Sequence, residues 1–284
     1  MSVLKLFDAH CHMQDPRIFE RAPNLIATAL SSGVNHFAVN GVSEVRTPLD
    51  WQIVKQMGEA YPSVVPCFGL HPWYVKERTS NWLTTLTMYL KNTPSSAVGE
   101  IGLDKGNHAK HIDFSDQVDV FRKQLELAKN MNKPASIHCV RAFGDLLEIL
   151  KECGPFPAGL ILHSYMGSAE MVSEFAKLGS FFSFSGFLMS MKTQKAKKML
   201  KAVPSDRILL ETDAPDALPS ALLDDSHEES SVSDSVELLN HPANIHKVLR
   251  YIASLLDITV EELAERSYNN SVSVFSYEGS KIKC

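Results

Sequence analysis

Short apolar or β-branched runs alternate with segments of helical periodicity eight times along this chain, and this alternation most constrains its fold. The runs predict eight strands, at Lys5–Cys11, His36–Val42, Val64–Leu70, Ala97–Leu103, Ala135–Cys139, Gly159–His163, Phe181–Phe187 and Ile208–Thr212. The segments between them carry apolar residues three and four positions apart, as at Val118, Phe121 and Leu125. Strand then helix, repeated eight times, predicts a parallel sheet closed as a single TIM-type (β/α)8 barrel. An open doubly wound sheet is the lesser alternative, and no G-x-G-x-x-G motif supports it.

The chain length agrees with one barrel. A (β/α)8 barrel typically has about 250 residues, so we expect a single domain over residues 1–284. Residues 216–240 break the pattern, because they carry seven acidic residues, six serines and no Lys or Arg. We interpret them as a flexible acidic loop after the eighth strand. Pro242–Asp257 and Val260–Ser267 look helical and would cover the barrel from outside.

Charge and cysteine content limit the function classes. The formal net charge is −5, so the protein as a whole does not attract nucleic acid or an anionic membrane, and any phosphate binding must be local. The five cysteines are scattered and form no C-x-x-C pair, which predicts reduced thiols and an intracellular location, cytoplasmic or nuclear. No apolar stretch approaches the length of a membrane span.

Asp8, His10 and His12 alternate along the first predicted strand. Because successive side chains of a strand lie on opposite faces, all three lie on the same face. Two imidazoles about 6.6 to 7 Å apart along the backbone can hold one metal ion from one side. A hydrogen-bonded pair of core histidines is the alternative, but it would need several buried partners.

Further polar residues end other predicted strands, where a barrel brings them to one mouth: His71, Glu100, His138, His163 and Asp213. Mixed imidazole and carboxylate ligands favour Zn²⁺ or Mn²⁺, with Mg²⁺ still open. One tetrahedral ion cannot use all of them, so we expect two divalent ions about 3.5 to 4 Å apart, with Glu100 as the bridge. Such a pair supplies hydroxide near neutral pH and stabilises the cleavage of a phosphoester.

Individual roles can be assigned in part from the sequence. Asp213 is the candidate general base. Glu211 lies deeper on the same strand face, where it either orients a ligand or is purely structural. His71 precedes Pro72 in a turn and would either donate to a substrate phosphate or pack within that turn.

Several motifs then appear in a fixed order from the first strand to near the end of the chain: Asp8-x-His10-x-His12, Gly69-Leu-His-Pro72, Gly99-Glu-Ile-Gly-Leu-Asp104, His163-Ser-Tyr-Met-Gly167, Glu211-Thr-Asp-Ala-Pro215 and Tyr268-Asn-Asn270. In this the chain resembles the TatD-type deoxyribonucleases. The resemblance implies a TIM-barrel metallohydrolase that acts on DNA. It also implies a two-metal site whose ligands are His10, His12, Glu100, His138, His163 and Asp213.

Two other functions stay open. A small-molecule amidohydrolase or phosphoesterase would share the first-strand histidines, but many amidohydrolases bridge their metals with a modified lysine. Here Glu100 stands on the fourth strand and Lys105 lies beyond it. A barrel that binds metal or a partner without turnover is the second alternative. The acidic segment would repel long DNA, which favours strand ends, short single strands or another phosphoester as substrate.

Overall fold

A parallel eight-stranded sheet forms the centre of the molecule. The computed structural model describes residues 4–45, 49–219 and 239–283. Its strands are β1 (Leu6–Cys11), β2 (Val34–Asn40), β3 (Val64–Phe68), β4 (Ala97–Asp104), β5 (Ala135–Val140), β6 (Leu160–Leu162), β7 (Ser180–Phe184) and β8 (Ile208–Leu210). Each strand pairs in parallel with the next, in the order β1 to β8. The eight predicted strands and the TIM-type barrel are therefore confirmed.

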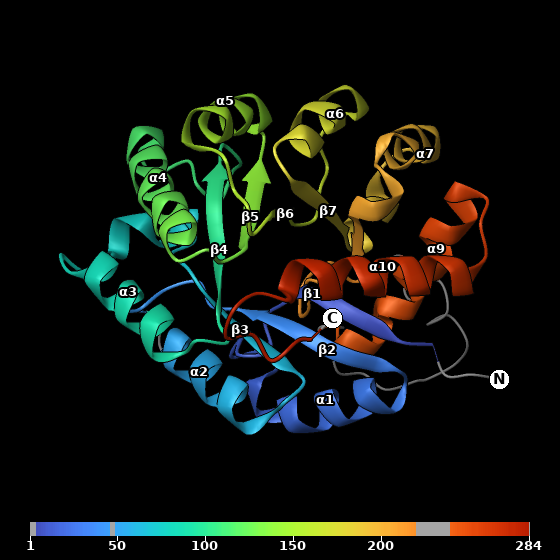
Figure 1. Ribbon diagram of the computed structural model, residues 1–284, viewed down its shortest axis with the longest axis horizontal. Helices are drawn as coiled ribbons and strands as arrows, with labels where there is room; N and C mark the ends of the chain where they lie inside the picture. Colours follow the sequence, from blue (N-terminus) through green and yellow to red (C-terminus); the bar gives the residue numbers. More distant parts are fainter. Residues whose placement is uncertain (1–3, 46–48, 220–238, 284) are drawn as a thin grey trace, which may run out of the picture.

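Helices surround the strands in a ring (Figure 1). They are α1 (Ala22–Ser31), α2 (Asp50–Ala60), α3 (Trp82–Asn92), α4 (Phe114–Asn130), α5 (Phe143–Cys153), α6 (Ala169–Lys177), α7 (Thr193–Ala202), α9 (Ile245–Leu256) and α10 (Val260–Phe275). Each presents an apolar stripe to the sheet; on α4, for example, Phe121 and Leu125 are fully buried. Over the described ranges, no helix is both long enough and apolar enough to cross a membrane.

Hydrogen bonds between the first and last strands close the barrel. Just beyond β8, Asp213 donates its backbone N–H to the carbonyl of His10 at 2.9 Å, and His12 donates its own to Ala214 at 2.7 Å. The carboxylate of Asp8 accepts from the backbone N–H of Thr212 at 2.9 Å and from its hydroxyl at 2.5 Å. Asp8 thus helps to close the barrel. Burial raises the pKa of its carboxyl group to about 8 despite these hydrogen-bond donors.

The C-terminal helix is longer than the sequence pattern predicts. The expected helix stops at Ser267, before the polar run Tyr268-Asn-Asn270, whereas α10 continues to Phe275. The side-chain amide of Asn270 donates to the carbonyls of Ser205 and Ile208, and thereby fixes α10 against β8. These tertiary hydrogen bonds satisfy the polar side chain of Asn270 within a helix that the local sequence pattern does not predict. The predicted acidic loop, 216–240, lies largely outside the described residues.

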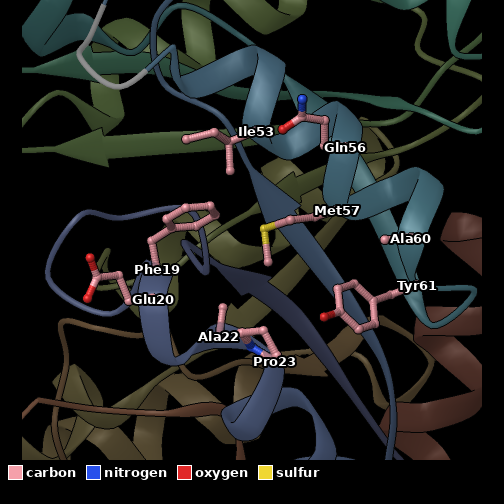
Figure 2. A pocket seen from close by; sticks show the side chains of 9 residues that line it. All are labelled: Phe19, Glu20, Ala22, Pro23, Ile53, Gln56, Met57, Ala60 and Tyr61. Atoms are coloured by element: carbon pink, nitrogen blue, oxygen red, sulfur yellow. The ribbon is translucent and has the colours of Figure 1, made fainter.

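A cavity of about 330 Å³ lies outside the barrel, between the start of α1 and one face of α2. Phe19, Met57 and Tyr61 are among its mostly apolar lining residues (Figure 2). None of the polar residues predicted to end strands lines it. The chemistry of this fold must therefore be sought at the barrel mouth.

Candidate functional site

The seven polar residues predicted at strand ends meet at that mouth. They are His10, His12, His71, Glu100, His138, His163 and Asp213. The strands themselves carry three of them, and the others lie within three residues of the ends of β1, β3, β6 and β8. All are buried except His12, whose side chain is 13% exposed. The convergence that a barrel imposes on strand ends is realised.

One oxygen of Glu100 faces the residues of β1 and of the segment after β8. Its Oε2 lies 3.5 Å from Nε2 of His10 and 3.3 Å from Nε2 of His12. Oδ1 of Asp213 lies 3.5 Å from the same His12 nitrogen and 3.9 Å from that of His10. His10, His12 and Asp213 thus form a compact group of potential ligands on this side of Glu100.

The other oxygen of Glu100 faces a second group of imidazoles. Its Oε1 lies 3.1 Å from Nδ1 of His138, 3.1 Å from Nε2 of His163 and 3.3 Å from Nε2 of His71. Glu100 therefore stands between two polar groups, with one carboxylate oxygen turned to each. This is the arrangement expected of a carboxylate that bridges two cations.

Electrostatics keep Glu100 ionised. Burial disfavours a charged carboxylate, but the contacts with His71, His163 and His10 together outweigh it and hold the pKa of Glu100 well below its usual value. A single ionised carboxylate enclosed by imidazoles is costly to bury unless cations or protons balance it. The cluster is thus suited to bind cations.

The outer nitrogens of the first two histidines are occupied by other partners. Nδ1 of His12 lies 2.8 Å from the carbonyl oxygen of Asn40, which can only accept, so this nitrogen carries the proton. Nδ1 of His10 lies 2.8 Å from the hydroxyl of Ser136. In the neutral ring of His12 the lone pair is therefore on Nε2, the nitrogen directed at Glu100. The Ser136 hydroxyl either donates to Nδ1 of His10 or accepts from it, and a neutral His10 that donates to Ser136 also has its lone pair on Nε2.

The outer nitrogens of the other two predicted ligands face carboxylates. Nε2 of His138 lies 3.1 Å from Oδ2 of Asp104, and Nδ1 of His163 lies 3.3 Å from Oε1 of Glu211. An ionised carboxylate only accepts, so each of these nitrogens carries a proton, and in the neutral ring the lone pair for a metal ion is on the inner nitrogen. Carboxylate–histidine pairs of this kind orient most metal-binding histidines.

His71 differs from these four histidines in its proton position. Its Nδ1 accepts the backbone N–H of Trp73 at 3.1 Å, so the proton of the neutral ring is on Nε2, which faces Glu100. Burial lowers the pKa of His71 to about 4, so the ring is neutral. His71 lies within ligand distance of Glu100 and His138. In this tautomer, however, it donates a hydrogen bond and offers no lone pair to a metal.

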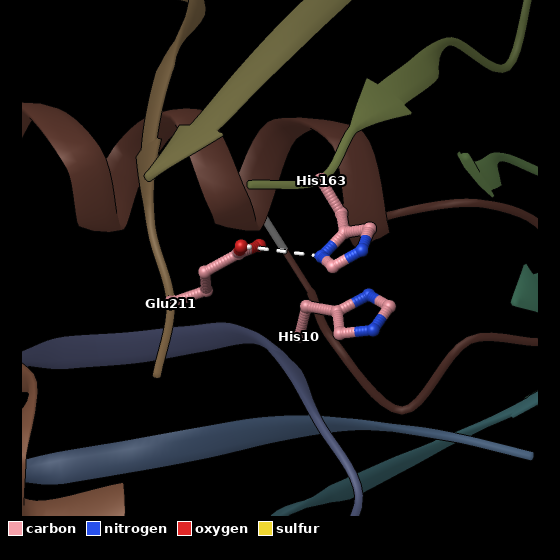
Figure 3. A group of neighbouring side chains, drawn as sticks. All are labelled: His10, His163 and Glu211. Atoms are coloured by element: carbon pink, nitrogen blue, oxygen red, sulfur yellow. Dashed lines mark hydrogen bonds and ion pairs between the residues drawn. The ribbon is translucent and has the colours of Figure 1, made fainter. Parts of the chain in front are cut away.

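Glu211 is also close enough to be a ligand, since it groups with His10 and His163 (Figure 3). Its Oε1 already accepts from the backbone N–H and the hydroxyl of Ser164, both at 2.7 Å, besides facing His163. Its Oε2 accepts from the hydroxyl of Ser183. These donors occupy the carboxylate, so Glu211 is better suited to orient His163 than to hold an ion.

A family model described as TatD related DNase matches residues 7–276. The chain belongs to this family. The match includes all seven polar residues of the barrel mouth. It also confirms the resemblance drawn from the motifs.

Individual TatD relatives agree with this assignment. A protein of Bacillus subtilis named uncharacterized metal-dependent hydrolase YabD is 30% identical over 95% of this chain and 98% of its own. A protein of Pantoea vagans named 3'-5' ssDNA/RNA exonuclease TatD is 25% identical over 95% of this chain and 99% of its own. The crystal structure of the TatD homologue YJJV of Escherichia coli superposes with a TM-score of 0.81, at 24% identity over 97% of this chain and 99% of that one. The chain is therefore a metal-dependent hydrolase of the class that acts on ester bonds.

Sequence reasoning missed most of the residues that orient the histidines of this TatD site. Ser136 could have been found, because it lies two positions before His138 and hence on the same strand face. Asp104 ends the motif Gly99-Glu-Ile-Gly-Leu-Asp104, but its place there does not indicate that it orients a histidine. Asn40 acts through its backbone carbonyl, which leaves no signal in the identity of the residue.

Asp104 offers a test of how this outer layer acts. Its Oδ2 accepts from Nε2 of His138 at 3.1 Å and from the indole N–H of Trp73 at 2.6 Å. We expect Asp104→Asn to weaken metal binding by about 10- to 100-fold, because an amide no longer holds the His138 proton on the outer nitrogen. Titration of metal against a competing chelator measures this. Asp119→Asn, which changes an exposed carboxylate on α4, is the control, and equal affinities in both variants would contradict this role.

Proposed function

We propose that this TatD-family hydrolase cleaves phosphodiester bonds of DNA with the help of two divalent cations. The observation that carries the proposal is the position of Glu100, with one oxygen turned to each of two ligand groups. A site for one ion would need only one such group. Mixed nitrogen and oxygen donors favour Zn²⁺ or Mn²⁺ and leave Mg²⁺ open.

The donor atoms divide into two sets that share Glu100. His10, His12 and Asp213 would hold one ion, and His138 and His163 would hold the other. The four histidines fit this role because each has its outer nitrogen engaged and its inner nitrogen directed at Glu100. When bound, such a pair of ions supplies hydroxide near neutral pH and stabilises charge on the phosphate.

The protein's own residues provide two further roles. The carboxylate of Asp213 lies beside His12 at the edge of the cluster and accepts the proton of the attacking water as general base. Nε2–H of His71 faces Glu100 in the absence of substrate, and it donates instead to a phosphate oxygen when the substrate is bound, a role its tautomer permits. The buried walls of the mouth exclude bulk water, which strengthens both contacts.

Strand ends or short single strands fit the mouth better than long duplex. The net charge of −5 gives no general attraction for DNA. Both described ends of the predicted acidic loop lie beside the site, because Asp216 donates its backbone N–H to Asp213 and Asn240 donates to Pro215, each at 2.9 Å. The name of the Pantoea relative, an exonuclease of single-stranded DNA and RNA, supports the same substrate class.

The amidohydrolase alternative lacks its usual bridging lysine. Nζ of Lys105 lies 2.7 Å from Asp145, and both side chains are substantially exposed. This ion pair holds Lys105 on the surface, whereas Glu100 occupies the bridging place. A barrel without turnover is disfavoured because every predicted ligand is present and oriented.

The first experiment is a metal-restoration assay. Chelator-stripped protein receives Mg²⁺, Mn²⁺ or Zn²⁺ separately, together with end-labelled single- or double-stranded DNA. We expect a ladder of shortened strands only with metal, faster on single strands, and none with His10→Ala because its ligand nitrogen is gone. Intact DNA in the presence of bound metal would refute the nuclease function and redirect the search to small phosphoesters and cyclic amides.

A further inference from the structure

Two neighbouring aromatic side chains lie at the barrel mouth and have no role in the proposed cleavage. Trp73 lies in the 3-10 helix η2 (Pro72–Glu77) after β3, and His108 lies in the loop between β4 and α4. Their ring centroids are 4.9 Å apart with an interplanar angle of 31°. Trp73 is half-buried and His108 is exposed. The pair therefore presents aromatic surface to solvent beside the polar cluster.

The orientation of Trp73 is fixed by the site itself. Its indole N–H donates to Asp104, and its ring lies 4.8 Å from that of His71 and 5.9 Å from that of His138, centroid to centroid. Both of these contacts are edge-on, at 77° and 74°. The other two tryptophans, Trp51 and Trp82, are only 1% and 6% exposed. Trp73 thus differs from the core tryptophans in being only half-buried, beside the proposed reacting centre.

We propose that Trp73 and His108 form a stacking surface for an unpaired nucleobase of the substrate strand. The inference rests on the proposed function, because it names how that substrate is held. Aromatic rings bind single strands by stacking, which tolerates any base and is unavailable in an intact duplex. A base on this surface would lie within one nucleotide of a phosphate held at the neighbouring His71.

A cation close by suits the backbone of such a strand. Arg141 follows β5 directly and is exposed. The strand register pairs Asp104 with Val140, and Lys105 donates its backbone N–H to the Val140 carbonyl, so Arg141 emerges beside the end of β4. Within the described part of the chain, its guanidinium forms no ion pair. The proposed stacking surface and a guanidinium suited to bind phosphate therefore lie on the same side of the mouth.

The test compares variants of the exposed member of the pair. His108→Ala removes the outer ring without touching Trp73 or Asp104, His108→Phe restores a ring, and His111→Ala changes another exposed histidine of the same loop. The probe is a fluorescent single-stranded phosphorothioate oligonucleotide, with and without one abasic position. We expect His108→Ala to raise the Kd about fivefold or more, His108→Phe to bind at least as tightly as the unchanged protein, and His111→Ala to stay within about twofold.

The abasic probe separates stacking from charge. We expect one abasic position to weaken binding by the unchanged protein and to make it insensitive to His108→Ala. Equal Kd values for all variants, a loss with His108→Phe equal to that with His108→Ala, or no binding at all would overturn the stacking surface. Cleavage of ordinary DNA by the unchanged protein is measured in parallel. Base-dependent binding without cleavage would reject the nuclease function and support the stacking surface. Cleavage with equal Kd values for all variants would support the nuclease function and reject the stacking surface.

Discussion

Glu100→Ala is expected to abolish metal-dependent turnover and leave a folded barrel. The carboxylate turns one oxygen to His12 and the other to His138 and His163, so its loss separates the two proposed ions. Metal ions contribute several kcal/mol of charge stabilisation, and about 4 kcal/mol corresponds to a roughly 1,000-fold lower rate. We therefore expect kcat to fall at least about 1,000-fold. Turnover of end-labelled DNA measures the rate, and elemental analysis measures the bound metal.

The barrel should survive this change because the surrounding imidazoles can lose their protons when the carboxylate is removed. Circular dichroism and the midpoint of thermal unfolding test this, and Glu100→Gln, which keeps the side-chain volume, is the second variant if the alanine variant fails to fold. Glu126→Ala, an exposed glutamate on α4, is the matched control. Full activity of either Glu100 variant would exclude the two-metal mechanism.

The fold could be predicted from the sequence because two periodicities dominate it. A strand such as β3 is continuously apolar, and α4 repeats apolar residues at helical spacing, so local pattern and tertiary burial agree. The sequence pattern and the structure differ where a tertiary contact determines the local structure. Asn270 looks like a helix stop in isolation but is satisfied by carbonyls of the segment before β8 and of β8 itself, which lie more than sixty residues away in the sequence. A single-sequence pattern cannot contain that contact.

The convergence of the proposed metal ligands could be predicted from the barrel geometry, since strand ends must converge. The distinction between ligand, donor and orienting residue did not follow. His71 and His138 both end strands, yet His71 accepts a backbone N–H from Trp73 and His138 faces Asp104. In the neutral rings their inner nitrogens therefore have opposite hydrogen-bonding character. That difference depends on the partner of the far ring nitrogen, and neighbouring sequence does not specify it.

Asp213→Asn is expected to lower kcat strongly while most of the metal stays bound. Asp213 is offered both as a ligand beside His10 and His12 and as the general base. An asparagine keeps one oxygen as a weak ligand but accepts no proton, and loss of a general base costs about 100- to 10,000-fold. Asp213 also adopts a left-handed backbone conformation, φ 54°, which asparagine tolerates better than most residues. The fold should therefore be retained.

Asp213→Ala distinguishes the two roles, because it removes the ligand oxygen as well. If Asp213 acts as both ligand and base, the asparagine variant keeps about two ions and loses turnover, whereas the alanine variant loses turnover and the ion on the side of His10 and His12. Metal content by elemental analysis and single-turnover rates on single-stranded DNA provide the two measurements. If both variants lose one ion, Asp213 is a ligand only, and another group accepts the proton of the attacking water. Unchanged rates in Asp213→Asn would remove the general-base role, because an amide cannot take a proton from water at neutral pH.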